Sequence, residues 1–132
     1  IILMRDQGLR RLVKAIKGGR IAYLIPDEDL GDTNSVFSPF FGIPTATVPV
    51  VGWLASLTDA AVVPVFTRML DNGRYAFDIK PPLPGFPLGD KQADAATVNS
   101  VFEAEIRSAP EQALWTFKWF KTRPDNDVSP YD

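Results

Sequence analysis

The chain has 132 residues, which is the size of one domain with room for a hydrophobic core, and nothing in it indicates a second domain. With 45% hydrophobic residues and a net charge of −2, its composition is typical of a globular protein rather than a disordered one. The absence of cysteine and histidine excludes disulfides, thiol nucleophiles, cysteine-bound metals and Ser-His-Asp catalysis completed from these residues alone. Carboxylates remain the available acid/base groups.

The first predicted element is an amphipathic helix over residues 8–17, in which apolar residues recur at the i, i+3, i+4, i+7 spacing. Gly18 and Gly19 are expected to end it. Cations line and flank its other face: Arg5, Arg10, Arg11, Lys14, Lys17 and Arg20. They indicate either an ordinary solvated surface or a docking surface for an anionic partner, such as a phosphorylated lipid, an acidic carrier protein or an anionic membrane.

A buried strand is predicted over residues 21–25, because that run is nearly all apolar, and Pro26 is expected to end it. Three acidic residues follow directly: Asp27, Glu28 and Asp29. Open α/β folds place ligands at the carboxyl ends of strands, so these carboxylates are candidate site residues. The alternative is an ordinary acidic turn, since aspartate favours turns through local hydrogen bonds.

A loop of about a dozen residues, longer than a simple connector, is predicted over residues 27–39. An aromatic cluster closed by glycine follows it: Phe40, Phe41 and Gly42. Leaving phenylalanines in water costs about 1.5 to 3 kcal/mol each, so the loop must fold back onto the core or onto a lipid chain.

Helix and hairpin signals alternate in the middle of the chain. Residues 45–51, flanked and interrupted by prolines, are predicted to form a loop leading into a helix over residues 50–57. Residues 60–70 and 74–80 are predicted strands, joined by an Asp-Asn-Gly turn that tolerates positive φ. A bulge or an edge position is expected at Pro64.

The last third begins with a proline-rich connector over residues 81–89, followed by a helix from Asp90 with Glu105 near its buried edge. A second helix is predicted over residues 111–120 with Pro110 in its first turn. Its aromatic and basic residues suit either packing onto the sheet or a membrane interface. The polar tail from residue 122 is expected to fray. No phosphate loop, zinc-ligand set or nucleic-acid motif is present, so a nucleic-acid partner is not expected.

Several short motifs occur in a specific order and spacing across nearly the whole chain. They are the helix ending in Lys17-Gly18-Gly19, then Pro26-Asp27-Glu28-Asp29, Val36-Phe37-Ser38-Pro39-Phe40-Phe41-Gly42, Leu54-Ala55, Val63-Pro64, Ala109-Pro110-Glu111-Gln112 and Trp119-Phe120-Lys121-Thr122-Arg123-Pro124. In these motifs the chain resembles the bacterial lipid A biosynthesis lauroyl/myristoyl acyltransferases, which are members of the lysophospholipid acyltransferase superfamily.

The resemblance implies an acyltransferase on the cytoplasmic side of the inner membrane. Such an enzyme transfers an acyl chain from acyl carrier protein to a hydroxyl of a hydroxyacyl chain on a phosphorylated glucosamine disaccharide, with no cofactor or metal. The implied fold is α/β, a glycerol-phosphate-acyltransferase-like mixed sheet flanked by helices, to which residues 1–124 contribute the C-terminal part, with residues 125–132 as a polar tail. The family's catalytic motif is His-x-x-x-x-Asp/Glu, in which the imidazole takes the proton of the acceptor hydroxyl.

Because the chain has no histidine, that motif is expected upstream of Ile1, and the chain is expected to be a fragment that is inactive alone. Asp27 and Asp29 match the two acids of the family's Asp-x-Asp turn, Asp27 in a supporting catalytic role and Asp29 in a weaker one. Phe40, Phe41 and Gly42 match an aromatic-glycine element expected to shape the acyl or acceptor pocket. The substrate-binding cations are expected to be Arg5, Arg10, Arg11, Lys14 and Lys17. One departure is Phe117-Lys118-Trp119, where relatives typically carry His-Arg-Arg/Trp.

Two alternatives remain open at this level. One is an acyltransferase that acts on another glycolipid or on a glycerophospholipid. The other is a non-catalytic lipid-binding or partner-binding module that lacks the histidine motif. The sequence does not define acyl-chain length or oligomeric state.

Overall fold

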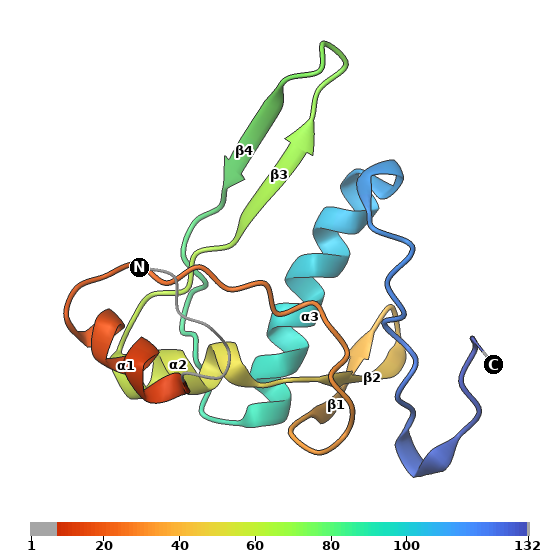
Figure 1. Ribbon diagram of the computed structural model, residues 1–132, viewed down its shortest axis with the longest axis horizontal. Coiled ribbons are helices and arrows are strands. Elements are labelled where there is room, and N and C mark those ends of the chain that lie inside the picture. The colour runs from red at the N-terminus through yellow and green to blue at the C-terminus, as the bar shows by residue number, and fades with distance from the viewer. Residues whose placement is uncertain (1–7, 132) are drawn as a thin grey trace.

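The computed structural model describes residues 8–131 (Figure 1). In chain order its elements are α1 (Leu9–Lys17), β1 (Val36–Phe40), β2 (Ile43–Thr47), α2 (Val50–Thr58), β3 (Val65–Met69), β4 (Tyr75–Ile79), α3 (Lys91–Ser108), and the 3-10 turns η2 (Pro110–Gln112) and η3 (Pro124–Asn126). The α/β class is therefore confirmed. Within residues 8–131 the strands form two separate antiparallel hairpins, β1–β2 and β3–β4, rather than one mixed sheet.

The basic helix α1 forms where the apolar spacing predicted it. It ends at Gly18 and Gly19: the N–H of Gly18 donates to Lys14 and Ala15, and Gly19 adopts a φ of +79° that favours glycine. The apolar face of α1 is half-buried against α2, whereas its cations are exposed. The amphipathic prediction for this segment is confirmed.

The predicted strand over residues 21–25 is wrong for the described structure. These residues have no strand assignment, and alternate side chains point into solvent, with Ile21 100%, Tyr23 76% and Ile25 67% exposed. Their apolar character favours a strand, but a strand also needs a neighbour to accept and donate backbone hydrogen bonds. None of the described strands pairs with this segment.

The β1–β2 hairpin replaces the loop predicted over residues 45–51 and the end of the loop predicted over residues 27–39. Its two-residue turn is Phe41-Gly42, and both residues have positive φ, at 50° and 77°. Pro44, one of the prolines that argued against a strand, lies opposite Pro39 in the register. Such a pair fits the non-hydrogen-bonded positions of an antiparallel ladder, where neither N–H points at the partner strand.

Helix α3 is the element against which the rest of the described fold is arranged (Figure 1). It begins as predicted, with Asp90 as the N-cap accepting a 2.7 Å hydrogen bond from the N–H of Ala93. Side chains of α3 also bind the outer edge of β1: Gln92 donates to the carbonyl of Phe37 at 3.0 Å, and Asn99 to that of Pro39 at 3.1 Å. The edge of the hairpin is thereby covered by a helix.

The buried core lies where α2, α3 and the β1–β2 hairpin meet. Its apolar members are Phe40, Ala46, Val51, Leu54, Ala55, Ala95 and Trp119. Helix α2 packs so closely on α3 that a Cβ at Gly52 would overlap the carboxylate of Asp94. Asp94 in turn accepts a 2.6 Å hydrogen bond from the N–H of Leu88, which fixes the proline-rich connector at the start of α3.

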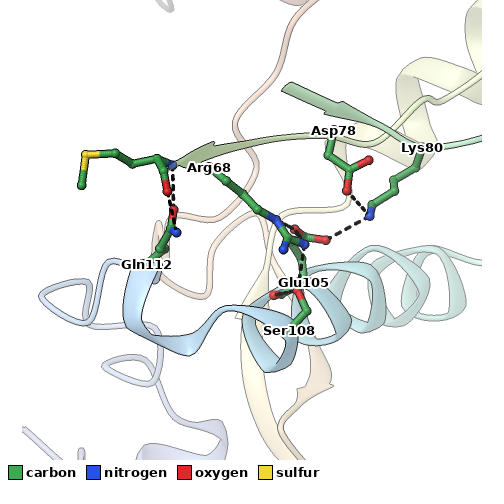
Figure 2. Close-up of polar contacts among 7 residues, drawn as sticks. Arg68, Asp78, Lys80, Glu105, Ser108 and Gln112 are labelled. Carbon is green, nitrogen blue, oxygen red and sulfur yellow. Dashed lines mark hydrogen bonds and ion pairs between the residues drawn. The ribbon is translucent and has the colours of Figure 1, made fainter. Parts of the chain in front are cut away.

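The β3–β4 hairpin forms around the predicted turn, but β3 begins only at Val65, directly after Pro64, so the strand predicted over residues 60–70 is wrong for residues 60–64. The inner face of the hairpin contacts α3 through both apolar and polar side chains: the ring centroid of Phe66 lies 5.8 Å from that of Phe102. Figure 2 shows the polar contacts, in which Arg68 and Lys80 both pair with Glu105, the residue predicted at the buried edge of the helix. The hydrogen bond from Lys80 to Asp78, with Glu105 nearby, raises the pKa of the Lys80 ammonium above its ordinary value, although desolvation opposes the shift. These contacts attach the hairpin to α3.

The outer face of the same hairpin is apolar. In the strand register Val65 lies opposite Ile79, Thr67 opposite Phe77, and Met69 opposite Tyr75. All six side chains are exposed, and Phe77 is 71% exposed. A hairpin face with this many large apolar side chains in solvent is unusual for a folded protein.

The helix predicted over residues 111–120 is wrong. Only the three-residue turn η2 forms, and the chain then runs through turns along α3 and β2. The aromatic residues of this segment lie on several faces instead of one stripe, so a straight helix could not bury them together. Within the tail that was predicted to fray, Thr122 is hydrogen-bonded to Asp29 and Ser129 is buried, so these two positions are held against the fold.

Candidate functional site

A pocket of about 260 Å³ opens between the acidic turn, the β1–β2 hairpin, α3 and the C-terminal segment. Its apolar wall comes from three of these four places: Phe40 on β1, Phe102 and Ile106 on α3, and Leu114 and Trp119 in the C-terminal segment. The acids after Pro26 lie on its remaining side. An apolar interior with carboxylates on one side can hold an aliphatic chain and hydrogen-bond a polar group attached to it.

Asp27 is half-buried in the wall of this pocket. Among the described residues it accepts no hydrogen bond, so both carboxylate oxygens are available to a ligand. Glu28 also lines the pocket, but it is exposed to solvent. Of the three acidic residues, Asp27 is thus the one whose carboxylate is half-buried and accepts no hydrogen bond from the described residues.

Asp29 has a different environment, since it is 5% exposed and accepts three hydrogen bonds. The N–H of Gly31 donates at 2.9 Å, and Thr122 donates through its N–H at 2.9 Å and its hydroxyl at 2.8 Å. Asp29 therefore fastens the C-terminal segment to the acidic turn, which holds Trp119 in the pocket wall. The two matched acids are brought together, but their surroundings assign them different tasks.

The residues of the aromatic-glycine element, Phe40, Phe41 and Gly42, also have different positions. Phe40 is buried in the pocket wall, with its ring centroid 5.6 Å from that of Trp119. Phe41 and Gly42 form the hairpin turn outside the pocket lining. The uncommon positive φ of Phe41 is supported by Glu103, which accepts its N–H at 2.7 Å, and by Arg107, whose guanidinium lies 4.9 Å from its ring centroid.

The predicted cationic residues lie apart from the pocket. Arg10, Lys14 and Lys17 are exposed on α1, and none of them lines it. Arg11 is also exposed and makes a contact within the protein. Arg5 lies outside the described residues. The α1 cations form a separate surface on the side of the fold where α1 packs against α2 (Figure 1).

Sequence reasoning missed Asn99, a buried polar residue of α3 that lines the pocket. A signal was present: Ala95, Asn99, Phe102 and Ile106 fall on one helix face, so the asparagine interrupts an apolar stripe. Trp119 was placed on a helix that does not form, and its burial in the pocket wall could not be read from that pattern.

The described residues limit other chemistries. No three acidic side chains among residues 8–131 are grouped closely enough to hold a metal ion. None of the helices in that range has the length and apolar character needed to cross a bilayer. The residues that line the pocket supply carboxylate and amide groups for hydrogen bonding beside an apolar surface.

Comparison with known proteins gives one consistent result. Residues 1–122 match the family model for bacterial lipid A biosynthesis acyltransferases. The lipid A biosynthesis lauroyltransferase of Escherichia coli K12 is 38% identical over 131 residues, 98% of this chain and 43% of that protein. The lipid A biosynthesis palmitoleoyltransferase of the same strain is 40% identical over 125 residues, 93% of this chain and 40% of that protein.

A lipid A biosynthesis acyltransferase of Haemophilus influenzae is 33% identical over 124 residues, 93% of this chain and 38% of that protein. The chain thus spans about two fifths of the length of these relatives, which are all more than twice as long as it is. The acidic turn, the pocket wall and α3 all lie within the matched range.

Proposed function

The chain belongs to the family of bacterial lipid A biosynthesis acyltransferases, and from this premise we propose that it is part of an enzyme that acylates a lipid A precursor. The donor is the thioester of acyl carrier protein, and the acceptor is a hydroxyl on a hydroxyacyl chain of a phosphorylated glycolipid. The enzyme works at the cytoplasmic face of the inner membrane. The observation that carries the proposal is the apolar pocket flanked by Asp27, because it provides space for an aliphatic chain beside an unengaged carboxylate.

The proton-transfer group of the reaction is not among these residues. The 132 residues contain no histidine, and the relatives are more than twice as long as the matched range. We place the His-x-x-x-x-Asp/Glu motif in the preceding part of a longer protein, so the present chain alone is expected to be inactive. Asp27 would then serve as the supporting carboxylate, accepting a hydrogen bond from the acceptor lipid and orienting it.

The acylation itself is tested through the lipids of the source organism. Deletion of the gene should remove one acyl chain from lipid A, detected by mass spectrometry, and the full gene should restore it. Loss of an acyl chain from another glycolipid or from a glycerophospholipid, with lipid A unchanged, would instead favour the other acyltransferase alternative. No change in any acyl lipid would contradict transfer altogether.

The exposed apolar faces support a longer domain. The outer face of β3–β4 and the segment of residues 21–25 both present large apolar side chains to solvent. We propose that other parts of the longer protein cover them, with residues 1–124 completing a single domain. Such burial removes the cost of exposing these side chains.

Phe77→Ser distinguishes the covered from the uncovered arrangement. In the longer protein the substitution is expected to lower the unfolding free energy by about 2 kcal/mol, because a buried phenylalanine contributes about 1.5 to 3 kcal/mol. In the 132-residue chain alone, where Phe77 is 71% exposed, the change should stay within about 0.5 kcal/mol. Urea denaturation of both proteins measures the difference, with Arg74→Ser in the exposed turn as control. Equal effects of Phe77→Ser in the two proteins would refute the covering.

The α1 cations are proposed to meet the acidic acyl carrier or the lipid phosphates. Charge reversal of three of them, Arg10→Glu, Lys14→Glu and Lys17→Glu, should raise the KM for the acyl carrier thioester about tenfold at low salt and flatten its salt dependence. Arg11 is left unchanged because it makes a contact within the protein. Steady-state kinetics of the longer protein provide the test, and Arg74→Glu is the matched control. An unaltered KM and salt dependence would exclude docking through α1.

A further inference from the structure

Three buried polar residues of the pocket wall, Thr45, Thr47 and Asp29, have no side-chain hydrogen free for a ligand. The hydroxyl of Thr45 donates to the carbonyl of Ile43 at 2.9 Å, and the hydroxyl of Thr47 donates to the carbonyl of Thr45 at 3.2 Å. Asp29, also buried there, is an acceptor of three hydrogen bonds. Any hydrogen bond between a ligand and the side chains of Thr45, Thr47 or Asp29 must therefore use a donor on the ligand.

Asn99 completes this wall, and its neighbours fix the orientation of its amide. Its Nδ2 lies 3.1 Å from the carbonyl of Pro39 and 2.9 Å from Oγ1 of Thr47. A carbonyl only accepts, and the single hydrogen of Thr47 is directed to Thr45, so both contacts require the amide nitrogen. Both N–H groups of Asn99 are thus engaged within the protein.

The amide oxygen of Asn99 has no hydrogen-bond partner among residues 8–131. The residue is only 8% exposed. Every fully enclosed side-chain oxygen or nitrogen among the described residues has a partner, so Oδ1 retains an opening, and Asn99 lines the pocket. An amide acceptor that opens into a cavity can bind a donor on a ligand, because a ligand that covers it without such a donor leaves it unpaired at a cost in free energy.

We propose that Asn99 Oδ1 accepts a hydrogen bond from a hydroxyl or an amide N–H carried on the acyl chain of the acceptor lipid. The ligand class rests on the proposed function, whereas the unpaired acceptor rests on the geometry. Phe102 and Ile106 follow Asn99 on the same face of α3 and also line the pocket, so an aliphatic chain beside them brings its polar substituent past Asn99. Asn99 is then a specificity-determining residue.

The consequence is discrimination against plain acyl chains. A chain with no hydrogen-bond donor would cover Oδ1 and leave it unsatisfied, whereas a donor-bearing chain pairs with it. The difference of one hydrogen bond corresponds to about a tenfold preference in affinity. An acyl pocket lined by hydrocarbon alone would instead favour the plain chain slightly.

Ligand binding to the full-length protein tests this inference. The probes are phosphorylated glucosamine bearing an amide-linked 3-hydroxyacyl chain, the same compound without the 3-hydroxyl, and the ester-linked counterpart without the amide N–H. Their dissociation constants can be followed by tryptophan fluorescence, because Trp119 lines the pocket. Wild type should prefer one donor-bearing probe about tenfold over the analogue lacking that donor, and the analogue that loses affinity identifies the hydroxyl or the amide.

Asn99→Leu should abolish the preference by binding the matched probes equally. Thr47→Val is the control: it removes a partner of the Asn99 N–H but not Oδ1, so the preference should persist even if stability falls. If Asn99→Leu does not fold, Asn99→Ala, which also removes Oδ1, provides the same comparison and should likewise bind the matched probes equally. Equal affinity of wild type for all three probes, or a preference that survives in Asn99→Leu, would overturn the role of Asn99. If wild type bound none of the probes, the proposed function would fail as well.

Discussion

Asp29→Ala is expected to lower the free energy of unfolding by about 3 kcal/mol, because hydrogen bonds to charged groups contribute about 1.5 to 3 kcal/mol each and their donors would be left without a partner. The carboxylate is 5% exposed and accepts from Gly31 and twice from Thr122. Its loss leaves two backbone N–H groups and one hydroxyl unpaired in a part-buried place. The substitution also releases the segment that holds Trp119 against Phe40.

Chemical denaturation of the longer protein and of its variant measures the Asp29 effect. Asp32→Ala, an exposed acid in the same loop, is the control and should change the unfolding free energy by less than about 0.5 kcal/mol. Thr122→Val removes only the hydroxyl partner and should cost about 1 kcal/mol. An Asp29→Ala protein as stable as wild type would show that the C-terminal segment is held by other contacts.

Local patterns in the sequence predicted the elements that local physics determines. The apolar spacing of α1, the Asp-Asn-Gly turn of β3–β4 and the N-cap of α3 each lie within a few residues of the structure they specify. They form as predicted because helix periodicity, positive φ at a tight turn and capping hydrogen bonds depend on near neighbours.

The errors have causes that are not local. Residues 21–25 have strand composition, but pairing depends on a partner strand that no short window contains. The β1–β2 hairpin was missed because Pro44 and Pro49 argued against a strand, whereas Pro44 lies opposite Pro39 at a position where its missing N–H costs no ladder hydrogen bond. In the C-terminal segment, Phe40 of the distant hairpin decides where Trp119 lies.

The sequence indicated where the candidate site lies, but not which of its residues line the pocket and which make structural contacts. Motif matching identified Asp27 and Asp29 together, and only the structure separates a half-buried, unengaged carboxylate from one that is bound to Thr122 across 93 residues of sequence. Likewise, Phe40 lines the pocket while Phe41 and Gly42 form the turn. Asn99 was missed because a single polar residue in an apolar stripe is ambiguous until its partners are known.

Asp27→Ala in the longer protein is the second large effect and the most direct test of the site. The side chain lies in the pocket wall and makes no hydrogen bond among the described residues, so its removal should barely change the unfolding free energy, by less than about 0.5 kcal/mol. A carboxylate that orients the acceptor should, when lost, reduce turnover about 100-fold. Asp27 and Asp29 therefore predict opposite patterns of stability and activity.

The decisive measurement is the rate of acyl transfer from acyl carrier protein thioester to a lipid A precursor by wild type and Asp27→Ala, with the unfolding free energy of both determined in parallel. Our account predicts a fall in kcat/KM of about 100-fold in a variant that is as stable as wild type. Asp32→Ala should keep wild-type turnover. Wild-type turnover in a correctly folded Asp27→Ala protein would contradict the assignment of this pocket as the site of transfer.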